Sequence, residues 1–337
     1  MPRRLQQLSR WLRERAGLAE FELEPASTDA SFRRYFRVRC DGRTLIAMDA
    51  PPEREDVRPY VGIARAFRGI GLNVPEILDT ELEQGFLLIS DLGTRLYLAE
   101  LNEATVERLY GDALGALAVL QACGPGDYAL PPYGRERLLT EMQLFRDWYL
   151  QRHLGLELDP QQGRILERAF GLLADSALAQ PVVPVHRDYH SRNLLVTDRN
   201  NPGIVDFQDA VMGPVTYDLV SLLRDCYIAW PRQQVEEWAL GYRDLALHSG
   251  ILRQEYDDAE FLRWFDLMGV QRHLKAAGIF ARLNHRDGKS GYLQDIPRTL
   301  GYVMEVTSRH SELAPFHELL QCLPVAQREG DAIGTPA

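Results

Sequence analysis

The residues with the clearest chemical potential lie in two short segments. Residues 186–193 read His-Arg-Asp-Tyr-His-Ser-Arg-Asn, and a short apolar run, Ile204-Val205, ends in Asp206, thirteen positions after Asn193. Transfer of a γ-phosphoryl group to a hydroxyl needs a carboxylate that accepts the hydroxyl proton, and oxygen ligands for the magnesium ions that neutralise the phosphates. Asp188 suits the first role, and Asn193 and Asp206 suit the second. The spacing therefore predicts phosphoryl transfer, because an ordinary polar loop would not need the second aspartate at the end of a strand.

Length and composition bound the class of protein. The chain has 337 residues, of which 45% are hydrophobic and 26% charged, as in a soluble globular protein with two lobes of unequal size. The net charge of −10 argues against general binding to nucleic acid or to an anionic membrane. We find no secretory signal after Arg3 and Arg4 and no apolar run of membrane-spanning length. The four cysteines are scattered without metal-ligand spacing, so we expect reduced thiols in a cytoplasmic, monomeric protein.

The elements that position these residues begin with a small lobe over residues 1–91. Phe32–Arg39 alternates apolar and charged residues, Asp41-Gly42 makes a turn, and Thr44–Met48 forms a second strand, which together predict a β-hairpin. Further strands are expected over residues 74–78 and 85–90, and helices near residues 5–12 and over 57–67.

Residues 92–325 predict a large lobe that is mainly helical. Helical periodicity recurs over residues 103–121, 135–151, 161–176, 217–228, 233–247, 258–282 and 297–311. The segment from Val182 to Phe207 interrupts the helices with short strands and the catalytic loop. Residues 326–337 are polar and contain glycine and proline, so we expect a flexible tail. The fold class that results is α+β, with a small antiparallel β lobe and a large helical lobe.

Two features resemble small-molecule kinases more than protein kinases. Asp206 begins Asp-Phe-Gln-Asp, not Asp-Phe-Gly, and Gly213-Pro214-Val215-Thr216-Tyr217-Asp218-Leu219 follows, with no Ala-Pro-Glu segment. These motifs resemble the aminoglycoside phosphotransferase and choline kinase superfamily, which has a two-lobed, protein-kinase-like fold. Residues 28–36, 48–53 and 207–210 are similar to its branch of bacterial N-acetylmuramate/N-acetylglucosamine anomeric kinases of peptidoglycan recycling.

The resemblance implies a role for each motif. Asp188 would be the catalytic base, and Asn193 and Asp206 would hold magnesium. ATP would bind under the turn around Asp29–Phe32, and the hinge at residues 90–93 would offer backbone groups to adenine. The nucleotide-binding residues implied in this way are Ser31, Phe32, Arg33, Arg34, Ser90, Asp91 and Leu92.

One position departs from the pattern of the relatives. Most of them place a lysine on the third strand, where it holds the α- and β-phosphates. Here the matching string is Leu45-Ile46-Ala47-Met48, so the position falls on Met48, which carries no charge. Either Arg33 or Arg34 substitutes, or magnesium carries more of the phosphate charge. Strand alternation puts the two arginines on opposite faces, so only one of them can point at the nucleotide.

The acceptor side is less constrained by the sequence. Asp209, Arg192 and Arg224 are candidates for contacts with the acceptor, although a turn-stabilising aspartate and solvated or ion-paired arginines would explain them equally. Because a carboxylated sugar needs a cation, one of Arg192, Arg224 or Arg272 should lie in the pocket. His273 and Lys275 could join that pocket or form a solvated helix face.

The leading hypothesis is an ATP- and Mg²⁺-dependent sugar kinase that phosphorylates the anomeric hydroxyl of N-acetylmuramate and N-acetylglucosamine. One alternative is phosphorylation of another small alcohol or amine, such as an aminoglycoside, choline or homoserine. A second is a pseudokinase that binds nucleotide and serves as an interaction module. The absent strand lysine favours the pseudokinase, whereas intact Asp188, Asn193 and Asp206 oppose it.

Overall fold

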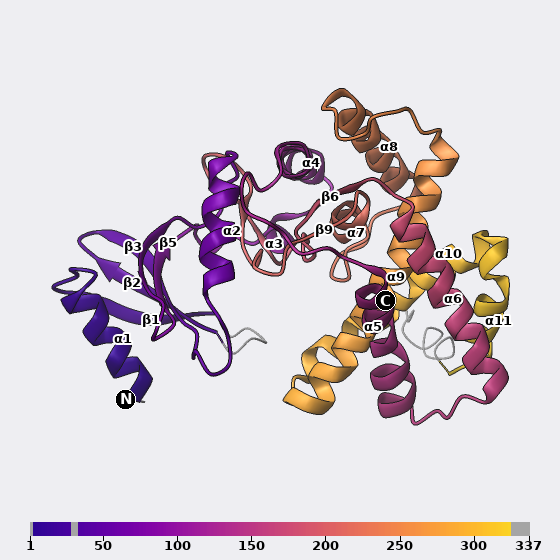
Figure 1. Ribbon diagram of the computed structural model, residues 1–337, viewed down its shortest axis with the longest axis horizontal. Helices are drawn as coiled ribbons and strands as arrows, with labels where there is room; N and C mark the ends of the chain where they lie inside the picture. The colour runs from indigo at the N-terminus through magenta and orange to yellow at the C-terminus, as the bar shows by residue number, and fades with distance from the viewer. Residues whose placement is uncertain (1–2, 28–32, 325–337) are drawn as a thin grey trace, which may run out of the picture. The chain divides into compact units, whose positions relative to one another are not determined.

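A computed structural model of the chain describes residues 3–27 and 33–324. The chain divides into two compact units, which we call the sheet unit (Met1–Ala129 with Arg192–Ala210) and the helical unit (Leu130–Ser191 with Val211–Ala337). We describe each unit by itself (Figure 1). The sheet unit reaches past the boundary that we predicted at Asp91 and takes in residues 192–210. The predicted tail, residues 326–337, lies outside the described residues.

The sheet unit is built on a five-stranded antiparallel sheet with the strand order β1-β2-β3-β5-β4. Its strands are β1 (Glu22–Ser27), β2 (Arg34–Cys40), β3 (Arg43–Asp49), β4 (Ile77–Glu81) and β5 (Phe86–Ser90), with a small pair, β7 (Leu194–Leu195) and β8 (Gly203–Ile204). The predicted hairpin is confirmed as β2 and β3. Its turn residues, Asp41 and Gly42, have φ of +48° and +73°, the left-handed conformation that aspartate and glycine tolerate best.

The helices of the sheet unit are α1 (Arg3–Glu14), α2 (Arg58–Gly69), α3 (Tyr97–Glu100) and α4 (Val106–Cys123). Helix α1 packs on one face of the sheet through a buried cluster of Leu8, Trp11, Leu12, Val38, Ala47, Phe86 and Leu88. Because side chains alternate along a strand, Tyr35 and Arg37 of β2 point to the opposite face. That second face is the one that lines a cavity.

The strand β1 is absent from the sequence prediction. Its sequence, Glu-Leu-Glu-Pro-Ala-Ser, contains Pro25 and little β-branched residue content, which is typical of a loop. The register of β1 against β2 shifts between Pro25 and Ser27, and the strand forms the edge of the sheet, where proline is tolerated.

The helical unit contains α5 (Arg135–Leu144), a π-helical segment η1 (Phe145–His153), α6 (Pro160–Leu178), α7 (Tyr217–Leu223), α8 (Arg232–His248), α9 (Asp258–Asp287), α10 (Ile296–Arg309) and α11 (Ala314–Cys322). The short turns η2 (Ser290–Asp295) and η3 (Ser311–Leu313) and the strand pair β6 (Val182–Val185) and β9 (Val211–Pro214) complete it. Six of the seven helices predicted for residues 92–325 correspond to these elements, although α7 ends at Leu223 and not at the predicted residue 228. The seventh, predicted over residues 103–121, is α4 of the sheet unit, and the α+β fold class is confirmed.

The long helix α9 organises the helical unit and packs against α5, η1, α6, α7 and α10 (Figure 1). Asp257 caps its start by accepting the backbone N–H of Glu260 at 2.8 Å. Glycine at position 278 is required by a close approach, because a Cβ there would lie 2.3 Å from the carbonyl carbon of Leu144. This close packing fixes the part of α9 that carries Arg272, His273 and Lys275.

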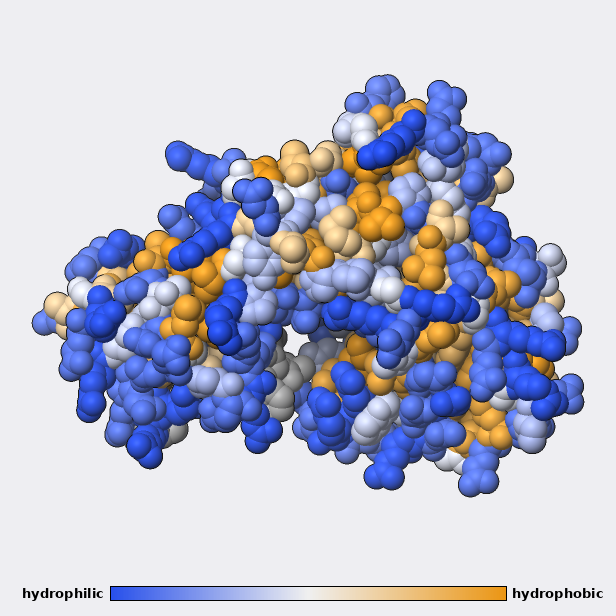
Figure 2. Space-filling model, in the orientation of Figure 1, coloured by the Kyte–Doolittle hydropathy of each residue, from blue (hydrophilic) through white to orange (hydrophobic). Residues whose placement is uncertain are grey.

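Hydrophilic residues cover most of the face shown in Figure 2. Within residues 3–27 and 33–324, none of the helices combines the length and the apolar character that crossing a bilayer requires.

Candidate active site

A cavity of about 390 Å³ lies in the sheet unit. Three segments line it: the free face of the sheet, the connector after β5, and residues around β7 and β8. Its lining includes Tyr35, Arg37, Ile46, Ile89, Ser90, Asp91, Leu92, Gly93, Thr94, Leu96, Arg192, Asn193, Leu195, Val205 and Asp206. The structure thus brings the predicted hinge residues together with both predicted magnesium ligands.

The connector is fixed by the carboxylate of Asp91. Arg37 donates to Asp91 Oδ2 from Nε at 2.7 Å and to Oδ1 from Nη2 at 3.1 Å, and the Gly93 N–H donates to Oδ1 at 2.9 Å. Burial alone would raise the pKa of Asp91, but the bonds from Arg37 and Gly93 hold it below its ordinary value. Because its side chain is committed to these bonds, Asp91 can serve the cavity only through its backbone.

The two predicted metal ligands are neighbours. Asn193 Nδ2 donates to Asp206 Oδ2 at 3.4 Å, and the N–H of Val205 donates to the carbonyl of Asn193 at 3.0 Å across the β7–β8 pair. Asp206 has φ of +65°, a conformation that a non-glycine residue adopts at a cost and that is frequent at functional sites. The side chain of Asp206 is 48% exposed, so its carboxylate is accessible.

Asn193 and Asp206 together suit a hard cation that takes most of its ligands from outside the protein. An amide oxygen and a carboxylate are ligands that Mg²⁺ accepts, with phosphates and water filling the rest of its octahedron. Among the described residues, no group of three or more His, Cys, Asp or Glu side chains gathers as in a site that holds a metal by itself. Asn193 and Asp206 therefore fit a magnesium ion that arrives with a nucleotide.

The side chain of Phe207 anchors the segment that follows β8 and carries Asp206. Its buried ring lies 4.8 Å from the ring of Tyr60 and 5.9 Å from the ring of Phe67, both on α2. Burying an aromatic ring between two others fixes its backbone, and the preceding residue is Asp206. The apolar position beside the metal-binding aspartate thus has a structural reason.

Met48 stands where the sequence pattern would place the strand lysine, and its side chain packs in the core of the sheet unit. Met48 is fully buried and pairs in register with Tyr35 on β2 and Leu87 on β5. Arg33, two residues before Tyr35, forms an ion pair with Glu55, and its Nη1 lies 3.7 Å from Asp206 Oδ1. Arg34 instead pairs with Asp49, on the other face of β2. Of Arg33 and Arg34, Arg33 is therefore the one that lies beside a predicted metal ligand.

Four further predicted residues divide between the described and undescribed parts of the chain. Arg192, a candidate for acceptor contacts, lines the sheet-unit cavity. Asp209 is exposed and accepts from Gln208 Nε2 at 3.4 Å, which also donates to Asp206. Ser31 and Phe32 lie outside the described residues.

In the helical unit, two buried aspartates hold the main chain of the catalytic loop. The oxygens of Asp218, on α7, accept the N–H of His186 at 2.6 Å and of Arg187 at 2.9 Å. Asp225 accepts the N–H of Ser191 at 2.9 Å. Arg187 has φ of +79°, so the loop makes a strained turn just before Asp188. Holding the loop at both ends fixes the backbone on either side of the candidate base.

The charge of Asp188 is maintained by cations. Burial alone would raise its pKa, but the electrostatic influence of Lys275, His190, Arg187 and Arg272 lowers it below its ordinary value. The carboxyl group is therefore ionised at neutral pH. A proton acceptor of this kind suits phosphoryl transfer, whose loose transition state needs little help from a strong base.

Two of these cations come from α9. Lys275 is buried, donates to the hydroxyl of Tyr217 at 3.0 Å, and lies 3.6 Å from Glu141 Oε2. Glu141 also pairs with Arg187 and accepts the Tyr133 hydroxyl. The alternative that His273 and Lys275 form a solvated helix face is wrong, because both are buried.

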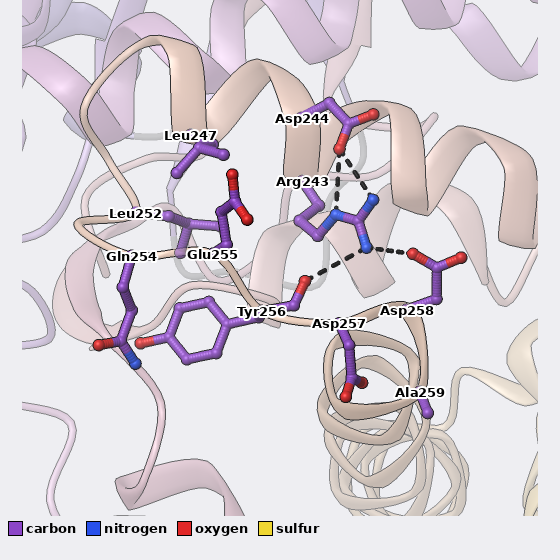
Figure 3. Close-up of a pocket in the computed structure, with 10 residues that line it drawn as sticks. All are labelled: Arg243, Asp244, Leu247, Leu252, Gln254, Glu255, Tyr256, Asp257, Asp258 and Ala259. Atoms are coloured by element: carbon purple, nitrogen blue, oxygen red, sulfur yellow. Dashed lines mark hydrogen bonds and ion pairs between the residues drawn. The ribbon is translucent and has the colours of Figure 1, made fainter.

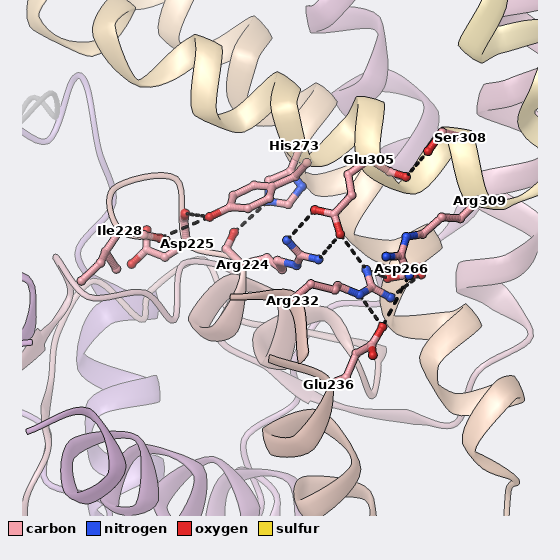
Figure 4. Close-up of polar contacts among 11 residues, drawn as sticks. Arg224, Asp225, Ile228, Arg232, Glu236, Asp266, His273, Glu305, Ser308 and Arg309 are labelled. Atoms are coloured by element: carbon pink, nitrogen blue, oxygen red, sulfur yellow. Dashed lines mark hydrogen bonds and ion pairs between the residues drawn. The ribbon is translucent and has the colours of Figure 1, made fainter. Parts of the chain in front are cut away.

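Arg224, the third candidate for acceptor contacts, is held in an ion pair (Figure 4). Both terminal nitrogens donate to Glu305, at 3.0 Å each, and the guanidinium lies 4.9 Å from the ring centre of Tyr302. Glu305 also lies 3.7 Å from Arg232, which pairs with Asp266. Arg224 thus belongs to a charged network that joins the end of α7 to α8, α9 and α10.

Figure 3 shows a second cavity, of about 570 Å³, at the turn between α8 and α9. Arg243 is its cation, and Asp244, Asp258 and the carbonyl of Tyr256 all accept hydrogen bonds from it. None of the residues that we predicted for chemistry lines this cavity. With its cation already bound to carboxylates, the cavity offers no evident catalytic group.

Comparison with known proteins now assigns the family. The sequence model of the phosphotransferase enzyme family matches residues 22–265. The chain belongs to this phosphotransferase family. Two similar relatives are named N-acetylmuramate/N-acetylglucosamine kinase. The one from Pseudomonas aeruginosa is 49% identical over 304 residues, which are 90% of this chain and 89% of that protein. The one from Pseudomonas putida is 46% identical over 336 residues, covering 96% and 98% respectively.

A solved structure agrees on the fold. The ADP-bound aminoglycoside phosphotransferase APH(2'')-Ib superposes with a TM-score of 0.57 at 14% identity and covers 88% of this chain and 97% of its own. The resemblance that the sequence motifs predicted is therefore confirmed, and so is the protein-kinase-like fold. Relatives named as kinases over about nine tenths of the chain support an active phosphotransferase and not the pseudokinase alternative.

Proposed function

We propose that this phosphotransferase moves the γ-phosphoryl group of ATP to the anomeric hydroxyl of N-acetylmuramate and of N-acetylglucosamine. The observation that carries the proposal is the combination of relatives of that name at up to 49% identity over most of the chain with an intact set of Asp188, Asn193 and Asp206. We assign the sheet unit to the nucleotide and the helical unit to the acceptor.

The nucleotide half of the reaction rests on the sheet-unit cavity. The apolar side chains of Ile46 and Ile89 suit a purine ring, and the backbone of Ser90–Leu92 suits its hydrogen-bonding edge. Asn193 and Asp206 would hold magnesium, which neutralises phosphate charge when bound. Arg33, next to Asp206, would replace the strand lysine as the cation on the phosphates.

The acceptor half rests on Asp188. The C1 oxygen of the sugar forms a bond to the γ-phosphorus as the bond to the ADP oxygen breaks, and the C1 hydroxyl proton passes to the Asp188 carboxylate. A hemiacetal hydroxyl is more acidic than an ordinary sugar alcohol, so a carboxylate with a lowered pKa is an adequate acceptor. The two aspartates that hold the loop keep this carboxylate in one place.

The proposed substrates indicate the cellular compartment in which the enzyme acts. A kinase that draws on ATP and recycled amino sugars belongs in the cytoplasm.

A panel of acceptors tests the proposal. ADP release should be measured with N-acetylmuramate, N-acetylglucosamine, an aminoglycoside, choline and homoserine at equal concentration. We expect turnover with the two amino sugars alone. Faster turnover of an aminoglycoside or of choline would move the chain to another branch of the same family.

A further inference from the structure

Arg272 on α9 is a buried cation that makes no direct contact with a carboxylate among the described residues. The residue is 5% exposed, and within the described part of the chain no carboxylate forms an ion pair with its guanidinium. In the same residues its Nε has no hydrogen-bond partner, and Nη1 makes only a weak bond to Cys226 Sγ at 3.8 Å. The carboxylates of Asp188 and Asp225 act on this guanidinium through space, but its buried Nε–H has no acceptor, and a buried donor without an acceptor is unfavourable unless a ligand accepts from it.

The surroundings of Arg272 connect it to the acceptor side of the reaction. Its Nη1 contacts Cys226, the residue after Asp225, and the carboxylate of Asp225 accepts the Ser191 N–H of the catalytic loop. The charge of Arg272 also helps to keep Asp188 ionised. All of these groups belong to the helical unit. The guanidinium is therefore near the group that receives the proton of the acceptor.

The other arginines that could serve an anionic acceptor are already engaged. Arg224 makes two 3.0 Å bonds to Glu305. Arg192 lines the cavity of the sheet unit, beside Asn193. Of the three arginines considered for a carboxylate, Arg272 is the one that the described protein leaves unpaired.

We propose that Arg272 is a specificity-determining residue that binds the lactyl carboxylate of N-acetylmuramate. The inference rests on the proposed function and adds the group that distinguishes its two sugars, because N-acetylglucosamine lacks the lactyl substituent. A guanidinium can bind a carboxylate with two parallel hydrogen bonds, and the Nε of Arg272 is a donor without an acceptor among the described residues. The lactyl carboxylate would accept the hydrogen bond that this Nε lacks.

The test compares the two sugars in the same variant. Arg272→Gln should lower kcat/KM for N-acetylmuramate by on the order of 100-fold, the value of a lost hydrogen bond between charged groups, and that for N-acetylglucosamine by a few-fold at most. Arg282→Gln is the matched control. Arg282 lies on the same helix, is half-buried, and its Nε also lacks a partner among the described residues. That control should leave the ratio of the two kcat/KM values unchanged.

A second measurement changes the substrate in place of the enzyme. The methyl ester of N-acetylmuramate, which keeps the shape but removes the charge, should be as poor a substrate for the parent enzyme as the acid is for Arg272→Gln. The variant should treat acid and ester alike. If Arg272→Gln lowered kcat/KM equally for both sugars, so that their ratio stayed unchanged, Arg272 would only position Asp188 and the proposal would be overturned. It would also be overturned if the parent enzyme used the methyl ester as well as the acid. A loss of kcat/KM in Arg282→Gln that was confined to N-acetylmuramate would overturn it as well. A parent enzyme inactive on both sugars would instead reject the proposed function, and this inference with it.

Discussion

Replacing Arg33 and Arg34 separately tests which cation substitutes for the strand lysine. The structure places Arg33 3.7 Å from Asp206 and pairs Arg34 with Asp49 on the other face of β2. We therefore expect Arg33→Ala to raise KM for ATP and Arg34→Ala to leave it nearly unchanged.

The magnitude for Arg33 follows from Coulomb's law. A unit charge about 4 Å from a phosphate oxygen contributes about 4 kcal/mol at an effective dielectric constant of about 20. Glu55 and Asp206 already share the charge of Arg33, so we reduce this to about 1.5–3 kcal/mol, a factor of about 10–150 in KM for ATP.

Arg34 is the matched control because it is adjacent, has the same charge and faces away. Its side chain is 42% exposed, and Asp49 keeps Arg4 as a second partner when Arg34 is removed. We expect a loss of at most about 1 kcal/mol in the free energy of unfolding and a change in KM for ATP below about twofold.

The assay is initial-rate kinetics at saturating sugar, with nucleotide affinity measured separately by calorimetric titration. If Arg33→Ala binds ATP like the parent, or if Arg34→Ala is the variant that loses affinity, the reasoning from strand faces is refuted. Two silent variants would leave the phosphate charge to magnesium and the backbone.

Three further predictions concern the carboxylates. Asp188→Asn keeps the loop shape but removes the proton acceptor, so kcat should fall by about 100-fold or more while ATP affinity stays within about twofold; near-normal turnover at saturating substrates would refute the role. Asp206→Ala should weaken nucleotide binding only when magnesium is present, and an affinity in the presence of magnesium equal to that of the parent enzyme would show that Asp206 is not a ligand. Burial, together with the charge of Asp188, raises the pKa of Asp218 from 3.8 to about 7, and only its ionised form accepts both loop N–H groups. Turnover should therefore rise with pH through about 7, whereas the contribution of Asp218 to stability, full below 3.8, should be lost as pH rises through 7. A flat pH–kcat profile from pH 6 to 8 would contradict the assignment.

The sequence was sufficient where chemistry dictates residue types at short spacing. Asp188, Asn193 and Asp206 are predicted because phosphoryl transfer needs those oxygens in that order, and the structure places Asn193 beside Asp206. The β2–β3 hairpin is predicted because Asp41-Gly42 tolerates positive φ, and it is confirmed. Strand alternation also separated Arg33 from Arg34. The roles assigned to these residues remain predictions for the experiments above.

The sequence was insufficient where partners are far apart along the chain. Arg224 meets Glu305 81 positions later, and Arg187 meets Glu141 46 positions earlier, and no periodicity carries that information. The run from Gln271 to Lys275 was open to interpretation for a related reason. Charged residues on a helix are usually solvated, and only the packing of α9 against several helices shows that these are buried.

The position of the transferred phosphate tests the central claim most directly. Parent enzyme should be incubated with ATP, magnesium and N-acetylmuramate or N-acetylglucosamine, and the product examined by phosphorus NMR, with the methyl glycosides of both sugars as matched controls. We predict a sugar 1-phosphate that no longer reacts as a reducing sugar, and no turnover of the methyl glycosides, which lack the free anomeric hydroxyl. A 6-phosphate product, or phosphorylation of a methyl glycoside, would contradict the anomeric assignment.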